Sequence, residues 1–150
     1  MPGQTTKFQV FFEDAREGDR LPKIELDASY TKLILAVAAT GDWFPSHHDP
    51  EYARKQGQKD IYLNTTFIAG FLDRIITDWA GPRTFIMKRK FSMQRSIFAG
   101  DTVYGEGIVK GCRKDDEGKG LIDVDVMMST QDGPCVPASA TILVPCRGEE

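Results

Sequence analysis

The strongest hydrophobic pattern in the chain lies between Asn64 and Trp79. Its apolar residues recur at the three- and four-residue spacing of an α-helix: Phe67, Ile68, Phe71, Leu72, Ile75, Ile76 and Trp79. Asn64 or Thr65 can cap the start of this helix, and Ala80-Gly81-Pro82 can end it. A stripe this wide is too apolar for a surface helix, so the pattern predicts a helix that other elements surround.

After Pro82 the apolar residues alternate with polar ones, as they do in β-strands. Turns are expected at 99–101 and 131–134, and a charged hairpin loop at 113–120. We expect the aromatic and methionine side chains of these strands to lie in the core. The residues that alternate are Phe85, Met87, Phe91 and Met93, then Val103 to Val109, then Ile122, Val124, Val126 and Met128, and finally Val136 to Val144.

Two shorter helices are expected before the central one. The segment 31–39 is rich in Leu, Ile, Val and Ala and ends before Gly41, and a short helix follows Asp49-Pro50, with Asp49 as its N-cap. One buried helix followed by an antiparallel meander predicts an α+β fold in which a sheet curls around the central helix.

Composition indicates a single domain, residues 1–150, in a soluble protein. Hydrophobic residues make up 41% and charged residues 27% of the 150, and the net charge of -3 argues against nucleic acid as a partner. No apolar run is long enough to cross a membrane, and the N-terminus lacks a signal peptide, so we expect a cytoplasmic protein. Cys112, Cys135 and Cys146 show no metal-ligand spacing, so we expect reduced thiols and neither a metal nor a cofactor.

The candidate chemistry lies in the loop at 41–50, which holds the only two histidines, His47 and His48. Asp42 precedes His47 by five residues and can face it across a small gap, with Asp49 on the other side. A carboxylate and an imidazole that share a water molecule can carry out general acid–base catalysis. On spacing alone, a polar loop with helix-capping aspartates explains these residues equally well.

This loop, together with the order of the elements, resembles the MaoC-like hydratase family of hot-dog-fold proteins over nearly the whole chain. The residues that carry the resemblance are Phe12-Glu13-Asp14, Gly18-Asp19, Ala39-Thr40-Gly41-Asp42, Pro45, His47, Asp49-Pro50-Glu51-Tyr52-Ala53 and Phe98-Ala99-Gly100-Asp101-Thr102-Val103. His47-His48-Asp49, Lys59-Asp60-Ile61 and 77–82 are similar to the small MaoC-like subunit of steroid side-chain enoyl-CoA hydratases.

The resemblance implies an (R)-specific enoyl-CoA hydratase, which adds water across a trans-2-enoyl thioester to give a 3-hydroxyacyl-CoA. Asp42 and His47 correspond to the catalytic pair, and a backbone N–H near Asn64 and Thr65 would stabilise the charge that develops on the thioester oxygen. Relatives commonly have Asn at the position of Phe44, so the polar group that orients the pair is missing here or comes from elsewhere. Relatives also tend to have Gly where this chain has Asn64-Thr65.

Lys88-Arg89-Lys90, with Arg95, forms the densest basic stretch and could bind the phosphates of CoA, since Lys and Arg make charge-assisted contacts with phosphate. A solvated strand face is the simpler interpretation. Strand aromatic and methionine side chains could also line an acyl tunnel. Acyl carrier protein remains an alternative to CoA as the carrier of the acyl group.

Other interpretations remain open. We expect His48 to be structural, and a zinc site at His47, His48 and Asp49 is unfavourable because adjacent ligands chelate poorly. A thioesterase that uses Asp73 or Asp78 on the central helix would leave the Asp42–His47 pair unexplained. The resemblance implies a homodimer or higher homo-oligomer, or a heteromer with a second MaoC-like or DUF35-containing subunit, in which this chain could be catalytic or supporting.

Overall fold

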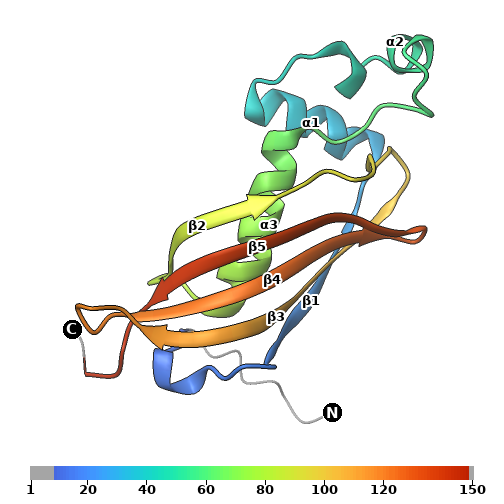
Figure 1. Ribbon diagram of the computed structural model, residues 1–150. Coiled ribbons are helices and arrows are strands. Elements are labelled where there is room, and N and C mark those ends of the chain that lie inside the picture. The colour runs from blue at the N-terminus through green and yellow to red at the C-terminus, as the bar shows by residue number, and fades with distance from the viewer. Residues whose placement is uncertain (1–8, 149–150) are drawn as a thin grey trace.

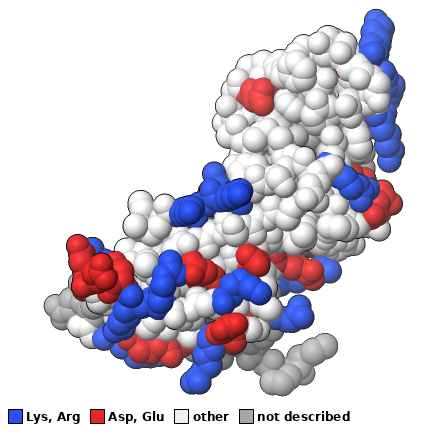
Figure 2. All heavy atoms as spheres, in the orientation of Figure 1, with Lys and Arg blue, Asp and Glu red and all other residues white. Residues whose placement is uncertain are grey.

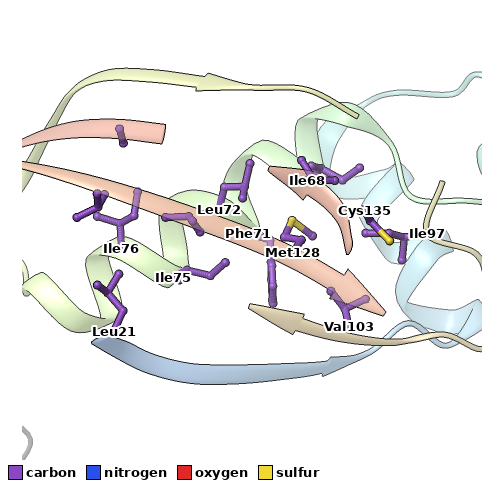
Figure 3. Close-up of a cluster of buried hydrophobic side chains, with 14 of the residues drawn as sticks. Leu21, Ile68, Phe71, Leu72, Ile75, Ile76, Ile97, Val103, Met128 and Cys135 are labelled. Atoms are coloured by element: carbon purple, nitrogen blue, oxygen red, sulfur yellow. The ribbon is translucent and has the colours of Figure 1, made fainter. Parts of the chain in front are cut away.

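The central helix is present as α3, Thr65–Ala80, in a computed structural model that describes residues 9–148. Asn64 caps it: the Asn64 side-chain oxygen accepts the N–H of Phe67 at 2.7 Å. Its apolar stripe points at the strands, as Figure 3 shows for Phe71, Leu72 and Ile75. The prediction of a surrounded helix is confirmed, and its bounds were predicted to within one residue at either end.

Five antiparallel strands form one sheet in the order β1-β3-β4-β5-β2. Figure 1 shows α3 crossing one face of this sheet. The predicted meander is confirmed, because β3, β4 and β5 are neighbours in space as they are in sequence. The strands are β1 Arg20–Asp27, β2 Phe85–Phe91, β3 Thr102–Lys114, β4 Gly120–Thr130 and β5 Gly133–Val144.

Strand β1 was not predicted from the sequence. Its pairing with β3 shifts register between Leu21 and Ile24, with Pro22 and Lys23 inside the irregularity. The two-residue alternation that marks a half-buried strand is therefore broken in the middle of the segment. Only Ile24 and Leu26, which pack against the core, alternate with charged neighbours.

The prediction that the aromatic and methionine side chains of β2 lie in the core was wrong for Phe85 and Met87. These side chains are 63% and 56% exposed, whereas Ile86 and Phe91 pack against the core. A register shift between Ile86 and Lys88 interrupts the strand's pairing with β5. Met93 lies beyond the end of β2 and is also exposed, at 52%.

A helical lobe lies beyond the N-terminal end of α3 (Figure 1). It contains α1, Tyr30–Thr40, the 3-10 turn η2, Pro45–His47, and α2, Pro50–Lys55; a further 3-10 turn, η1, Phe12–Asp14, precedes β1. Asp49 caps α2 by accepting the N–H groups of Glu51 and Tyr52, so the predicted cap is confirmed. Ser29 caps α1.

Cys112 is half-buried, and Cys135 lies in the core. Within residues 9–148, no helix combines the length and apolar character needed to cross a bilayer. The predicted lack of a signal peptide concerns the first residues of the chain, which lie outside the described range.

Candidate active site

The loop that joins α1 to η2 brings Asp42 and His47 together. Helix α1 ends at Gly41, whose φ of +70° is favourable for glycine and whose N–H bonds to the Val37 carbonyl at 2.9 Å. The chain then reverses through η2, which starts at Pro45. As a result, the Nε2 atom of His47 lies 3.6 Å from the Oδ2 atom of Asp42.

The tautomer of the neutral His47 ring follows from the hydrogen-bond partner of its Nδ1 atom. The Nδ1 atom lies 2.8 Å from the backbone carbonyl oxygen of Tyr62. Because a carbonyl can only accept a hydrogen bond, Nδ1 carries the hydrogen, and in the neutral ring Nε2 presents its lone pair toward Asp42. The imidazole is 8% exposed, so it is held in this orientation within the protein.

Two proton acceptors therefore face each other across the 3.6 Å between Nε2 and Oδ2. A water molecule that donates one hydrogen to each atom would complete a triangle with them. This is the geometry in which one group takes a proton from the water while the other returns one to the substrate.

The carboxylate of Asp42 is oriented by backbone. The Phe44 N–H donates to the Oδ1 atom of Asp42, with 3.4 Å between nitrogen and oxygen. A polar group thus reaches the carboxylate although the Phe44 side chain cannot donate a hydrogen bond. The donor does not depend on the Phe44 side chain.

Aromatic rings surround the imidazole. The ring centroid of Tyr62 is 4.9 Å from that of His47, and the centroid of Phe44 is 5.6 Å away, both in edge-on geometry. Tyr52 of α2 packs edge-on against the Phe44 ring, with 6.1 Å between the centroids of these two rings. Aromatic rings therefore contact the imidazole of His47 from two neighbouring residues.

Both halves of the pair are tied to the start of α3. The Nδ2 atom of Asn64 donates to the Thr40 hydroxyl at 2.8 Å, and this hydroxyl donates to the Ala36 carbonyl at 2.7 Å. On the other side, Tyr62, which binds His47, lies two residues before Asn64. The acid–base loop and the N-terminus of α3 therefore form one connected unit.

The predicted substrate contact at Asn64 and Thr65 was a backbone N–H, and the Asn64 side chain itself is fully engaged inside the protein. It is 1% exposed, its oxygen caps α3 and its nitrogen binds Thr40. What remains for a ligand at this end are the N–H groups of the first helical turn, at Thr65 and Thr66, which have no partner within a helix. The Thr65 hydroxyl lies 3.5 Å from the Met93 sulfur.

Comparison with known proteins identifies the family. The profile of the MaoC like domain matches residues 31–130, which is two-thirds of the chain. The chain belongs to the MaoC-like family.

A curated relative of this MaoC-like chain is the 3-oxo-4,17-pregnadiene-20-carboxyl-CoA hydratase beta subunit of Mycobacterium tuberculosis, 33% identical over 125 residues that cover 83% of this chain and 93% of the relative. A chain in the crystal structure of the ChsH1-ChsH2 complex from the same organism is 32% identical, covers 86% of this chain and 98% of its own, and superposes with a TM-score of 0.80.

An (R)-hydratase from A. caviae is 19% identical and superposes with a TM-score of 0.80, covering 89% of this chain and 99% of its own. At that identity the likeness concerns the fold alone. With the five-stranded antiparallel sheet around α3, these neighbours confirm the predicted α+β hot-dog fold.

The other polar groups of the loop have separate partners in this MaoC-like chain. The Nε2 atom of His48 lies 3.1 Å from the Trp43 carbonyl oxygen, and the carboxylate of Asp49 caps α2. His47, His48 and Asp49 therefore do not converge on a common point. Across residues 9–148 there is no cluster of His, Cys, Asp and Glu that could hold a metal ion.

Arg89 is engaged differently from the other residues of the basic stretch. It pairs with Asp73 on α3 and donates to the Ala69 carbonyl at 3.2 Å, so it holds β2 against the helix. Lys88 and Lys90 are exposed as well, but within the described residues neither has such a partner on α3. Figure 2 shows basic side chains over the position of β2.

The remaining charged candidates are also paired. Arg95 donates to the Asp132 carbonyl at 2.9 Å, and Asp78 lies 3.0 Å from Arg74, one helical turn away. With Asp73 bound to Arg89, both carboxylates of the thioesterase alternative have a cationic partner. These ion pairs do not favour that reaction, because they engage the carboxylates that it would use.

A groove of about 630 Å³ lies elsewhere, across the strands. Its lining includes Asp125 and Met127, which alternate along β4 with the buried Val126, so the groove is on the sheet face that points away from α3. Asp42 and His47 are not among its lining residues. We place the candidate active site at the acid–base pair, because the groove holds no comparable set of reacting groups.

Proposed function

We propose that this protein is an (R)-specific enoyl-CoA hydratase, which adds water across a trans-2-enoyl thioester to give a 3-hydroxyacyl-CoA. The observation that supports this most directly is the bare Nε2 atom of His47 facing the Asp42 carboxylate at 3.6 Å. The hydratases among its relatives support the same reaction class.

In the proposed reaction, Asp42 and His47 share the attacking water. As the water oxygen bonds to C3, one of the two groups accepts a proton from it, and the electrons of the double bond move toward the thioester carbonyl. The N–H groups at the start of α3 stabilise the resulting negative charge, and one such donor is typically worth about 3 kcal/mol of barrier. A proton delivered to C2 by the pair completes the addition.

The test compares Asp42→Asn and His47→Ala with the wild-type protein on a panel of enoyl-CoA thioesters, with the configuration of the product determined by chiral chromatography. Each substitution should lower kcat by about 10²- to 10⁴-fold, the usual contribution of a positioned acid or base. His48→Ala is the matched control, because its ring contacts the Trp43 carbonyl instead of the pair. Full activity in either site variant would eliminate the mechanism.

We propose that Lys88 and Lys90 contribute to binding the phosphates of CoA. Both are exposed on β2, whose C-terminal end leads to Met93 beside Thr65. Lys88→Ala and Lys90→Ala should raise KM for an enoyl-CoA but leave KM unchanged for the same acyl group on N-acetylcysteamine, which has no phosphate. Lys110→Ala, an exposed lysine on β3, is the control. Equal effects on both thioesters would contradict the assignment.

We propose that the free edge of β2 pairs with a second subunit, either another copy of this chain or a different MaoC-like or DUF35-containing chain. β2 pairs only with β5 and exposes Phe85 and Met87, and long apolar edges are usually covered. The beta-subunit relative and the two-protein complex support a heteromer. Light scattering and activity of the protein alone and co-expressed with a MaoC-like partner test this; a fully active monomer would refute it.

A further inference from the structure

Phe44 is a large apolar side chain left half-exposed beside the reacting imidazole. Its ring is 47% exposed, although its centroid lies 5.6 Å from that of the buried His47. An exposed apolar surface at a reacting group is a place where ligand burial would be favourable.

Two aromatic neighbours contact the Phe44 ring and restrict its position. Tyr52 of α2 packs against it in edge-on geometry, at 6.1 Å between centroids and 86° between planes. His47 contacts it at a second edge. Two such contacts restrict the positions of the ring, so it can favour one ligand shape over another.

The position relative to the thioester indicates which part of a substrate would meet Phe44. The N–H groups proposed to bind the thioester carbonyl are at Thr65 and Thr66, on the side of His47 marked by Tyr62 and Asn64. Phe44 is the N-cap of η2, and its ring contacts that of His47. We take a bound acyl group to have its thioester at the start of α3 and its tail at Phe44.

We propose that Phe44 determines acyl selectivity, its ring forming the apolar wall against which a bulky, ring-containing acyl group lies. This rests on the proposed hydratase function. A crotonyl group has only one methyl group beyond C3 and reaches little of the wall, whereas a cyclic group beyond C4 can pack against the ring face.

The experiment takes advantage of the fact that Asp42 is oriented by the Phe44 backbone N–H, which every non-proline substitution retains. Phe44→Ala and Phe44→Leu are compared with the wild-type protein on crotonyl-CoA, trans-oct-2-enoyl-CoA and trans-4-cyclohexylbut-2-enoyl-CoA. Trp43→Ala is the matched control, because that neighbouring exposed ring contacts His48 and not His47.

In Phe44→Ala the ratio of kcat/KM for the cyclohexyl substrate to that for crotonyl-CoA should fall about tenfold, the low end of what one methylene produces in an apolar pocket. Phe44→Leu should restore most of the ratio, and Trp43→Ala should leave it unchanged. An unchanged ratio in Phe44→Ala, or a rise caused by relief of obstruction, would overturn the proposal. The proposal would also be overturned if Phe44→Ala lowered the molecular mass measured by light scattering and left the kcat/KM ratio unchanged. That result would show that the ring is a subunit contact.

A binding measurement separates this proposal from the hydratase assignment. Calorimetry with the saturated 4-cyclohexylbutanoyl-CoA and butanoyl-CoA needs no turnover, and Phe44→Ala should weaken only the former, again by about tenfold. If the wild-type protein binds both equally, Phe44 selects nothing, whatever the reaction. If it discriminates but hydrates none of the enoyl thioesters, the proposed reaction fails and the selectivity stands.

Discussion

The hydrogen bond between Thr40 and Asn64 should couple the stability of the fold to activity, because it joins the end of α1 to the start of α3. Asn64→Ala removes both functions of a side chain that is only 1% exposed. The cap on the Phe67 N–H is lost, and so is the 2.8 Å bond to the Thr40 hydroxyl.

The expected size follows from these two contacts. Loss of an N-cap typically costs about 1 kcal/mol, and loss of a buried hydrogen bond about 1 kcal/mol more. We therefore expect Asn64→Ala to lower the free energy of unfolding by about 2 kcal/mol, which for a chain of this length lowers Tm by roughly 4 to 8 °C. Thr40→Val leaves the Asn64 donor buried without a partner and should cost about 1 to 3 kcal/mol.

Urea unfolding of wild type, both single variants and the double variant forms a cycle that isolates the interaction, whose coupling should be at least about 0.5 kcal/mol. Thr40→Val should also lower kcat by about tenfold, because the residue lies two positions before Asp42 and small displacements of catalytic groups are costly. Ser29→Ala, which removes the α1 cap, is the control and should leave kcat unchanged. Additive single variants with normal kcat would show that the contact does not position the loop.

Three further outcomes follow from the packing and the charges. Gly105→Ala should destabilise the fold by about 1 to 3 kcal/mol in thermal unfolding, because the new Cβ atom would lie 2.6 Å from the Ile75 side chain. Gly111→Ala is the control, because a Cβ atom there would meet open space. Equal stability of the two variants would contradict the packing. Arg89→Ala should lower the free energy of unfolding in urea by about 1 to 2 kcal/mol, because it leaves the Asp73 carboxylate on α3 unpaired. A loss no larger than that caused by replacing an exposed lysine with alanine would refute the pairing. For Asp60, burial raises the pKa, but hydrogen bonds from the Tyr30 hydroxyl and a backbone N–H, with a nearby arginine, leave the pKa below its ordinary 3.8. This carboxylate therefore stabilises the fold above about pH 4 and loses its effect as pH falls through the lowered pKa, so the difference in unfolding free energy between wild type and Asp60→Asn should shrink in acid.

The main elements could be predicted where one face of an element is buried without interruption. Helix α3 shows a full apolar stripe, and β4 alternates strictly, so both were found. Strand β1 was missed because its irregularity around Pro22 and Lys23 breaks the period on which the prediction depends. The faces of β2 were misassigned for a related reason: sequence shows that Phe85 and Met87 alternate, but not toward which side.

The acid–base pair could be located from spacing and resemblance, but its surroundings could not. The carbonyl that fixes the His47 tautomer belongs to Tyr62, and any residue there would offer the same oxygen. Thr40 was the one detectable signal that was overlooked, since it is a polar residue ending an apolar helix directly before Gly41. Asn64 was selected correctly as a residue of the helix start, but its side chain faces inward.

Phe44 shows how a backbone donor can leave the side chain of the same residue free to be apolar. A side-chain donor two residues after the aspartate and a backbone donor at the same position can reach the same carboxylate, and here the backbone N–H does so at 3.4 Å. Once the orienting bond is supplied by the main chain, the side chain is no longer constrained to be polar. An aromatic ring at that position then adds contact with the imidazole and leaves half of its own surface open. If the proposed function holds, variants of Phe44 keep the backbone donor to Asp42 and change only the surface offered to an acyl group, which is why activity and selectivity should separate in them.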